Sequence, residues 1–193
     1  MPSPVAHLSV GVVLWCALRR RLTCLSARWR GGEFLLLGLF LFFSMMPDLD
    51  SVVGLLAGDF GRYHNQATHS LLFGAAVTLL LAALAARLVP AVPFRVWTLV
   101  MTLPYLAHVA MDAFTHGRGV KLLWPLTDRR FQAPVELFGG VRWSRGWWDA
   151  RHLVTLGEEI AFATLLFVVT GLVMRRHARH AGDAASAGER DGA

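Results

Sequence analysis

Three ionisable side chains recur at four-residue intervals in the stretch "YLAHVAMDAFTHGRG" (residues 105–119): His108, Asp112 and His116. At 3.6 residues per turn, positions i, i+4 and i+8 lie along one stripe of a helix. Most of the stretch up to His116 is apolar enough for a lipid bilayer, where ionisable side chains are costly and usually mark a functional site. Imidazole nitrogens and carboxylate oxygens together suit a divalent metal ion such as zinc, manganese or iron.

The composition of the whole chain is typical of an integral membrane protein. Of its 193 residues, 55% are hydrophobic and 17% are charged, and the mean hydropathy is +0.48. The net charge of +6 is also found in nucleic-acid-binding proteins, but the sequence has no nucleic-acid motif. Basic loops beside a membrane account for the charge. We therefore expect the lipid bilayer as partner and no nucleic acid.

The elements that must position the ionisable residues are apolar helical runs. They cover about residues 5–18, 34–46, 70–88, 96–116 and 153–174. We expect an all-α fold: a polytopic membrane helix bundle of about five helices within an integral membrane domain, residues 1–181. A long irregular loop should separate the last two helices. Residues 182–193, "GDAASAGERDGA", have the composition of a disordered C-terminal tail.

Further ionisable residues lie where the other runs should reach the same membrane surface. His7 opens the first run, and Asp48 and Asp50, in "SMMPDLDS", follow the second. His64 and His69, in "YHNQATHSLL", lead into the third. Because successive crossings alternate in direction, all of these residues should meet the end of the fourth run at one face of the bundle.

The second run is too short to cross a bilayer by itself. Residues 34–46 give roughly 20 Å of helix, against about 30 Å of hydrocarbon. Pro47 then interrupts the helix, so Asp48 and Asp50 should lie in a recess below the surface. Buried carboxylates and imidazoles need partners or a cation. We predict one or two ions, zinc first with manganese or iron as alternatives. The candidate metal ligands are His7, Asp48, Asp50, His64, His69, His108, Asp112 and His116.

Each candidate also has a purely structural interpretation. Asp48 and Asp50 could cap the next helix, and His64 could be an ordinary loop residue. The residues on the fourth run could form a hydrogen-bonded network inside the bundle. For Glu158 and Glu159, near the start of the last run, either one of them hydrogen-bonds a ligand histidine or both lie at the membrane interface.

The long loop, residues 118–151, combines basic residues with Trp124, Trp143, Trp147 and Trp148. This composition is typical of a segment anchored at the membrane boundary. A second interpretation is that some of its basic residues receive an anionic group, such as a lipid phosphate, beside the metal. The candidate substrate-binding residues are Arg118, Lys121, Arg129 and Arg130.

The distribution of Lys and Arg predicts the orientation in the membrane. The side that holds the first loop, the third loop and the C-terminal tail carries the larger share of the 19 Lys and Arg residues. Cytoplasmic loops are enriched in these residues. We therefore expect the N-terminus and the cluster of ionisable residues to face outward from a bacterial cytoplasmic membrane.

Four segments together resemble a known family. They are "HLSVG" near the start, "PDLDS", "THSLL" and "HVAMDAFTHGRGVKLLWPLTDRRF", within residues 7 to about 131. They are similar to the bacterial inner-membrane proteins described as LexA-regulated, membrane-bound, predicted metal-dependent hydrolases. The resemblance matches His7, Asp48, Asp50, His69, His108 and Asp112 to the polar motifs of the family, with His64 and His116 beside them. The sequence departs from the family pattern at "HNQATHS", where a basic residue and a glycine are expected after the first histidine.

Two functions follow as hypotheses. The first is a metal-dependent hydrolase in which metal-activated water attacks an ester or phosphoester, such as that of a lipid, at the outer membrane face. Asp50 or Asp48 would then be the catalytic proton acceptor. The second is a metal-binding membrane protein without catalysis, such as a carrier, a sensor or a structural subunit. The scarcity of polar residues on the cytoplasmic half of the helices disfavours a carrier.

Overall fold

The computed structural model describes residues 2–58, 63–141 and 149–191, which are mostly helical and contain no β-strand. The α-helices are α1 (Pro4–Leu18), α2 (Thr23–Ser26), α3 (Gly32–Met45), α4 (Leu49–Leu56), α6 (Leu71–Leu88), α7 (Phe94–Ala113) and α8 (Arg151–Asp191). Short 3₁₀ turns are η1 (Arg19–Arg21), η2 (Met46–Asp48) and η3 (Ala67–His69). The predicted helical bundle is confirmed. Trp143, Trp147 and Trp148 lie outside the described residues.

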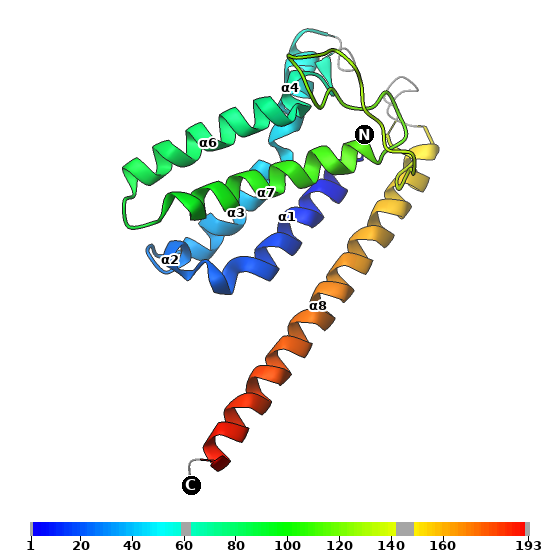
Figure 1. Ribbon diagram of the computed structural model, residues 1–193. Helices are drawn as coiled ribbons and strands as arrows, with labels where there is room; N and C mark the ends of the chain where they lie inside the picture. Colours follow the sequence, from blue (N-terminus) through cyan, green and yellow to red (C-terminus); the bar gives the residue numbers. More distant parts are fainter. Residues whose placement is uncertain (1, 59–62, 142–148, 192–193) are drawn as a thin grey trace.

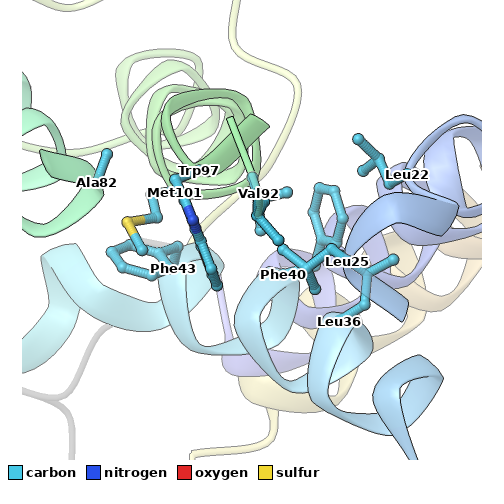
Figure 2. Packing of buried hydrophobic residues seen from close by; sticks show 10 residues of the cluster. Leu22, Leu25, Leu36, Phe40, Phe43, Ala82, Val92, Trp97 and Met101 are labelled. Carbon is cyan, nitrogen blue, oxygen red and sulfur yellow. The ribbon is translucent and has the colours of Figure 1, made fainter. Parts of the chain in front are cut away.

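Helices α1, α3, α6 and α7 pack as a bundle in which α7 contacts both α6 and α3 (Figure 1). Helix α8 packs on α1 and then runs away from the bundle toward the C-terminus. The apolar core fills one end of the bundle. It joins Leu36 and Phe40 of α3 to Trp97 and Met101 of α7, with Ala82 of α6 beside them (Figure 2).

Three segments are long and apolar enough to cross a membrane: Gly32–Leu56, Leu71–Leu88 and Arg151–Arg176. The first joins α3, η2 and α4, so the short second run gains the length that it lacks by continuing past Pro47. Proline has no backbone N–H to donate, which ends the regular α-helix at Met45 and leaves a 3₁₀ turn that carries Asp48. Both Asp48 and Asp50 are buried, as the proline predicted.

The polar ends of the helices gather at the end of the bundle opposite the apolar core. This end holds the start of α1, the α3–α4 junction, the start of α6 and the end of α7, because these helices alternate in direction. The segment between α7 and α8 folds over it, with a backbone hydrogen bond from Leu71 N–H to Leu122 O at 2.9 Å. Isolated bridges pair Thr115 with Phe138 and Val120 with Phe131. The predicted irregular loop is therefore ordered by backbone pairing in its described part.

Two boundaries differ from the sequence-based expectation. Helix α7 ends at Ala113 rather than at residue 116, because the His116 N–H bonds to Phe138 O at 2.9 Å instead of continuing the helix. Gly119, two residues after Gly117, has a positive φ of 69° that turns the chain away. Helix α8 continues to Asp191 through most of the segment for which we expect disorder. The alanines of that segment are strong helix formers.

Candidate metal centre

Four buried side chains present ligand atoms to one small space: Asp48, His69, His108 and Asp112. One atom from each lies within 4.8 Å of the atoms from the others. Asp48 comes from η2, His69 from η3, and the other two from consecutive turns of α7. The i, i+4 spacing of His108 and Asp112 therefore places both on the bundle-facing side of α7, as the sequence predicted.

The shortest separations run between atoms that carry lone pairs. His69 Nε2 lies 3.0 Å from Asp112 Oδ2 and 3.3 Å from His108 Nε2. Asp48 Oδ1 lies 3.5 Å from His108 Nε2 and 3.6 Å from His69 Nε2. Two nitrogens and two oxygens thus surround a common point, which is the donor set and number of a tetrahedral zinc site.

Backbone and side-chain acceptors orient both of these imidazoles. His108 Nδ1 donates to the backbone oxygen of Ser44 at 2.6 Å. His69 Nδ1 lies 3.2 Å from Asp50 Oδ2, which also accepts from the Thr68 hydroxyl at 2.7 Å. With both Nδ1 atoms protonated, the Nε2 lone pairs of His69 and His108 point into the cluster, as in metal sites whose histidines donate to a carboxylate or a carbonyl.

A second group of possible ligands, Asp50, His64 and His69, adjoins the first and shares His69 with it. His64 Nδ1 lies 2.8 Å from Ser51 Oγ and 3.3 Å from Asp50 Oδ1. The Ser51 hydroxyl donates to the same Asp50 oxygen at 3.4 Å, so Ser51 Oγ can accept from His64 Nδ1. Asp50 therefore lies at the centre of contacts that orient both histidines.

Several buried atoms of the cluster have no hydrogen-bond partner. They include both carboxylate oxygens of Asp48 and of Asp112, both ring nitrogens of His7, and His64 Nε2. Burying such atoms without compensation is costly. With the His69 proton on Nδ1, the Nε2 lone pair of His69 would face Asp112 Oδ2 at 3.0 Å, and the two atoms would repel each other. A bound cation would remove both costs, so the residues fit a divalent metal.

His7 is fully buried beside this group. Its ring stacks on His108 with the centroids 3.7 Å apart and an interplanar angle of 15°. His7 Nε2 lies 3.5 Å from Asp112 Oδ1, on the oxygen that does not face His69. His7 is thus placed to contact Asp112, while the four convergent ligands come from other elements.

His116 does not join the cluster, contrary to the prediction. Its ring lies 2.8 Å from Glu136 Oε2, and both side chains are largely exposed. The stripe of i, i+4 and i+8 positions requires a continuous helix, and α7 has already ended at Ala113. The signal that could have revealed this is the glycine pair at positions 117 and 119.

The four candidate substrate-binding residues have different environments. Lys121 pairs with Asp128 at 2.6 Å, and this ammonium group holds the pKa of Asp128 below its usual range. Arg130 donates to the backbone oxygens of Gly119 at 2.9 Å and Asn65 at 3.2 Å. Arg118 and Arg129 are exposed.

The structure also reveals polar residues that sequence reasoning missed or left open. Glu159 is fully buried and accepts from the backbone N–H of Ser3 at 2.5 Å and from its hydroxyl, so it binds the start of α1 rather than a ligand histidine. Glu158 accepts from Gly139 N–H at 3.0 Å. The Tyr105 hydroxyl donates to the backbone oxygen of Thr68. The only sequence signal for Tyr105 is its place one turn before His108.

Comparison with known proteins finds relatives that are named as inner membrane proteins. The chain is 29% identical over 171 residues to "Inner membrane protein YbcI" of Escherichia coli (strain K12), an alignment that covers 87% of this chain and 91% of the relative. No solved structure matches. The profile of the family described as YdjM inner membrane protein matches residues 1–181, which include the whole cluster. The chain therefore belongs to the YdjM inner membrane protein family.

Proposed function

We propose that this inner membrane protein is a metal-dependent hydrolase that cleaves an ester or phosphoester bond at the outer face of the membrane. The observation that carries the proposal is the convergence of Asp48, His69, His108 and Asp112 around one buried point, with both aspartates lacking hydrogen-bond partners. Structural polar networks normally satisfy their buried members. This cluster leaves its lone pairs facing one another, which favours an ion over an internal network.

The protonation of His69 favours one ion rather than two. A neutral imidazole has one nitrogen lone pair, and the contact with Asp50 assigns the His69 proton to Nδ1. His69 Nε2 can then serve only the group that contains Asp48, His108 and Asp112. We propose zinc for this site, with manganese or iron as alternatives, because its donors are two imidazole nitrogens and two carboxylate oxygens.

The metal, when bound, would supply Lewis acidity that brings the ionisation of a water molecule into the neutral pH range. His64 is placed to take the proton. Its Nδ1–H is directed at Ser51 Oγ and Asp50 Oδ1, which leaves the lone pair on Nε2. His64 Nε2 is buried without a hydrogen-bond partner and lies 3.9 Å from Asp112 Oδ2. A base oriented by a hydroxyl and a carboxylate is a common catalytic arrangement.

These contacts support different roles for the two aspartates from the proton acceptor considered for them. Asp50 accepts from Thr68 Oγ1 and from the Gln66 N–H, at 2.7 and 3.3 Å, so its oxygens are already engaged. We propose that Asp50 orients His64 and His69, and that Asp48 is a ligand. In the reaction, the water oxygen bonds to the carbonyl carbon or phosphorus, and the bond to the alcohol oxygen breaks. The water proton moves to His64 Nε2 and then to the departing alcohol.

The test is metal analysis of detergent-purified protein, followed by assays on phosphoesters and lipid esters. Asp112→Ala should lose both the metal and turnover. His64→Gln should retain the metal and lose turnover. His116→Ala is the matched control, since this histidine is exposed and outside the cluster, and it should change neither.

Two results would contradict the proposal in different ways. If the metal binds but no ester or phosphoester substrate is cleaved, the chain is a metal-binding membrane protein without hydrolase activity. If Asp48→Ala and His108→Ala both keep the metal content of the unsubstituted protein, the cluster is not the metal site.

A further inference from the structure

A pocket of about 500 Å³ lies between the start of α6 and the loop that follows α7. One part of its wall is apolar and includes Leu71, Leu123 and Phe131. Another part is basic and contains Arg129 and Arg130. The pocket is separate from the four convergent metal ligands, so it represents a second feature of the same end of the bundle.

The pocket shares its wall with the segment that carries His64 and His69. Arg130 Nη1 donates to the backbone oxygen of Asn65, the residue after His64. The Ser70 hydroxyl, directly after His69, donates to the Trp124 backbone oxygen at 2.5 Å. Arg130, which lines the pocket, is therefore bonded to the same stretch of chain that presents His64 and His69, and the Ser70 bond joins that stretch to the loop next to the lining residue Leu123.

The basic part of the pocket carries positive charge that carboxylates in the described residues do not neutralise. Lys121 is neutralised by Asp128, but no carboxylate within the described residues pairs with the Arg129 guanidinium. Arg130 is partly buried, and this burial together with the nearby Arg118 lowers its pKa. Like charges held close together are stabilised by an anion between or beside them, and a guanidinium binds phosphate oxygens through two parallel N–H bonds.

The apolar part continues toward the bilayer. Leu71 is the first residue of the membrane span Leu71–Leu88. Leu123 and Phe131 are 51% and 50% exposed, and Leu71 is 38% exposed. A pocket with guanidinium groups on one side and exposed apolar groups at the membrane boundary matches a molecule with an anionic head and an acyl chain, whereas a soluble phosphate would use only the basic side.

We propose that this pocket binds the phosphate headgroup of a membrane lipid, with the acyl chains along Leu71, Leu123 and Phe131. If the protein is the hydrolase proposed above, a consequence of this binding is that it acts on lipid phosphates. That consequence rests on the proposed function. Arg129 contacts the headgroup, and Arg130 fixes the position of the pocket against the backbone of Asn65.

Binding can be measured apart from hydrolysis. The full chain, in detergent with a metal chelator to prevent turnover, is mixed with phosphatidic acid in phosphatidylcholine, and bound lipid is counted by native mass spectrometry. Arg129→Gln should weaken phosphatidic acid binding about tenfold, the scale of one charge-assisted hydrogen bond. Arg95→Gln, at the other end of α7, is the matched control and should bind as the unsubstituted protein does.

Further measurements test the apolar wall. Leu123→Ser should weaken phosphatidic acid binding, and inorganic phosphate should compete poorly with the lipid. Competition by inorganic phosphate at concentrations equal to those of the lipid would overturn the assignment to a lipid. Equal binding by Arg129→Gln and Arg95→Gln would overturn the pocket itself. Phosphatidic acid that is bound but not cleaved after the metal is restored would refute this lipid as the substrate while leaving the binding site intact. Failure to cleave any ester or phosphoester tested would instead refute the proposed hydrolase.

Discussion

His108 Nδ1 donates a hydrogen bond to the backbone oxygen of Ser44 at 2.6 Å, which joins α7 to the last turn of α3. Because a carbonyl oxygen only accepts, the contact assigns the proton of a neutral His108 to Nδ1 and the lone pair to Nε2. His69 repeats the scheme with the Asp50 carboxylate as acceptor, at 3.2 Å. The two imidazoles are therefore oriented before any ion binds, which reduces the cost of forming the site.

The carboxylate behind His69 gives the first prediction. Asp50→Asn removes the negative charge that stabilises the Nδ1–H of His69, while the residue keeps its size. Metal affinity should fall by roughly 10- to 100-fold, as for other residues that orient metal-bound histidines. Titration of metal-free protein with zinc, followed by calorimetry, measures this. Glu136→Gln, an exposed change outside the cluster, should leave the affinity unaltered; an Asp50→Asn affinity equal to that of this control would refute the orienting role.

The second prediction concerns the packing of α6 against α7. A Cβ atom on Gly74 would overlap the ring of Tyr105, whose hydroxyl bonds to the Thr68 backbone. Gly74→Ala should therefore destabilise the protein by about 1–3 kcal/mol, the usual cost of overpacking, and weaken metal binding by displacing Thr68. Gly38→Ala is the control, because nothing lies within 4 Å of its Cβ position. Thermal unfolding in detergent should show no loss for Gly38→Ala, and equal unfolding temperatures for the two variants would contradict the argument.

The third prediction concerns the contact between α8 and the start of α1. Glu159→Ala removes the fully buried carboxylate that accepts from the backbone N–H and hydroxyl of the partly buried Ser3. Unfolding should become easier by about 1.5–3 kcal/mol, the usual contribution of a hydrogen bond to a charged group. Glu158→Ala, which removes a bond at an exposed position, should have a smaller effect on thermal unfolding. The opposite ranking of the two variants would show that Glu159 does not hold α1.

The fourth prediction tests the orientation. Cys24 is exposed in the first loop, which the positive-inside rule assigns to the cytoplasm. In intact cells of a Cys16→Ser variant, Cys24 should not react with a membrane-impermeant maleimide until the cells are lysed. A thiol placed by Gly117→Cys in the variant that lacks both native cysteines should react in intact cells. Labelling of Cys24 from outside would reverse the proposed orientation.

The sequence predicted the parts of the site that depend on regular geometry. Four-residue spacing in an α-helix brought His108 and Asp112 to the same face, and alternating crossings brought Asp48 and His69 to the same end of the bundle. Pro47 marked the interruption that buries Asp48. These inferences succeed because helix periodicity and the direction of crossings are properties of the backbone and do not depend on detailed packing.

The rest depended on tertiary contacts that carry no pattern along the chain. The Ser44 acceptor is a backbone oxygen, which any residue at that position would supply. The prediction that His116 is a metal ligand was wrong because α7 ends three residues before it. There the His116 N–H bonds to the Phe138 oxygen instead of making the helical hydrogen bond. The hydrogen bond between Glu159 and Ser3 joins residues that are 156 positions apart, so no local sequence pattern links them.

The positions of Asp48 and His69 in the chain have a consequence for folding. These two ligands enclose the segment 49–68, which includes α4, and an ion held by both would close that segment into a loop. Because the ion would bind the folded arrangement of these ligands and not the unfolded chain, the native state would gain stability when metal is present. Under the proposed function, the same ion would serve the reaction and fasten α3 to α6, and assembly of this end of the bundle would depend on the metal supply on the side of the membrane that this end faces.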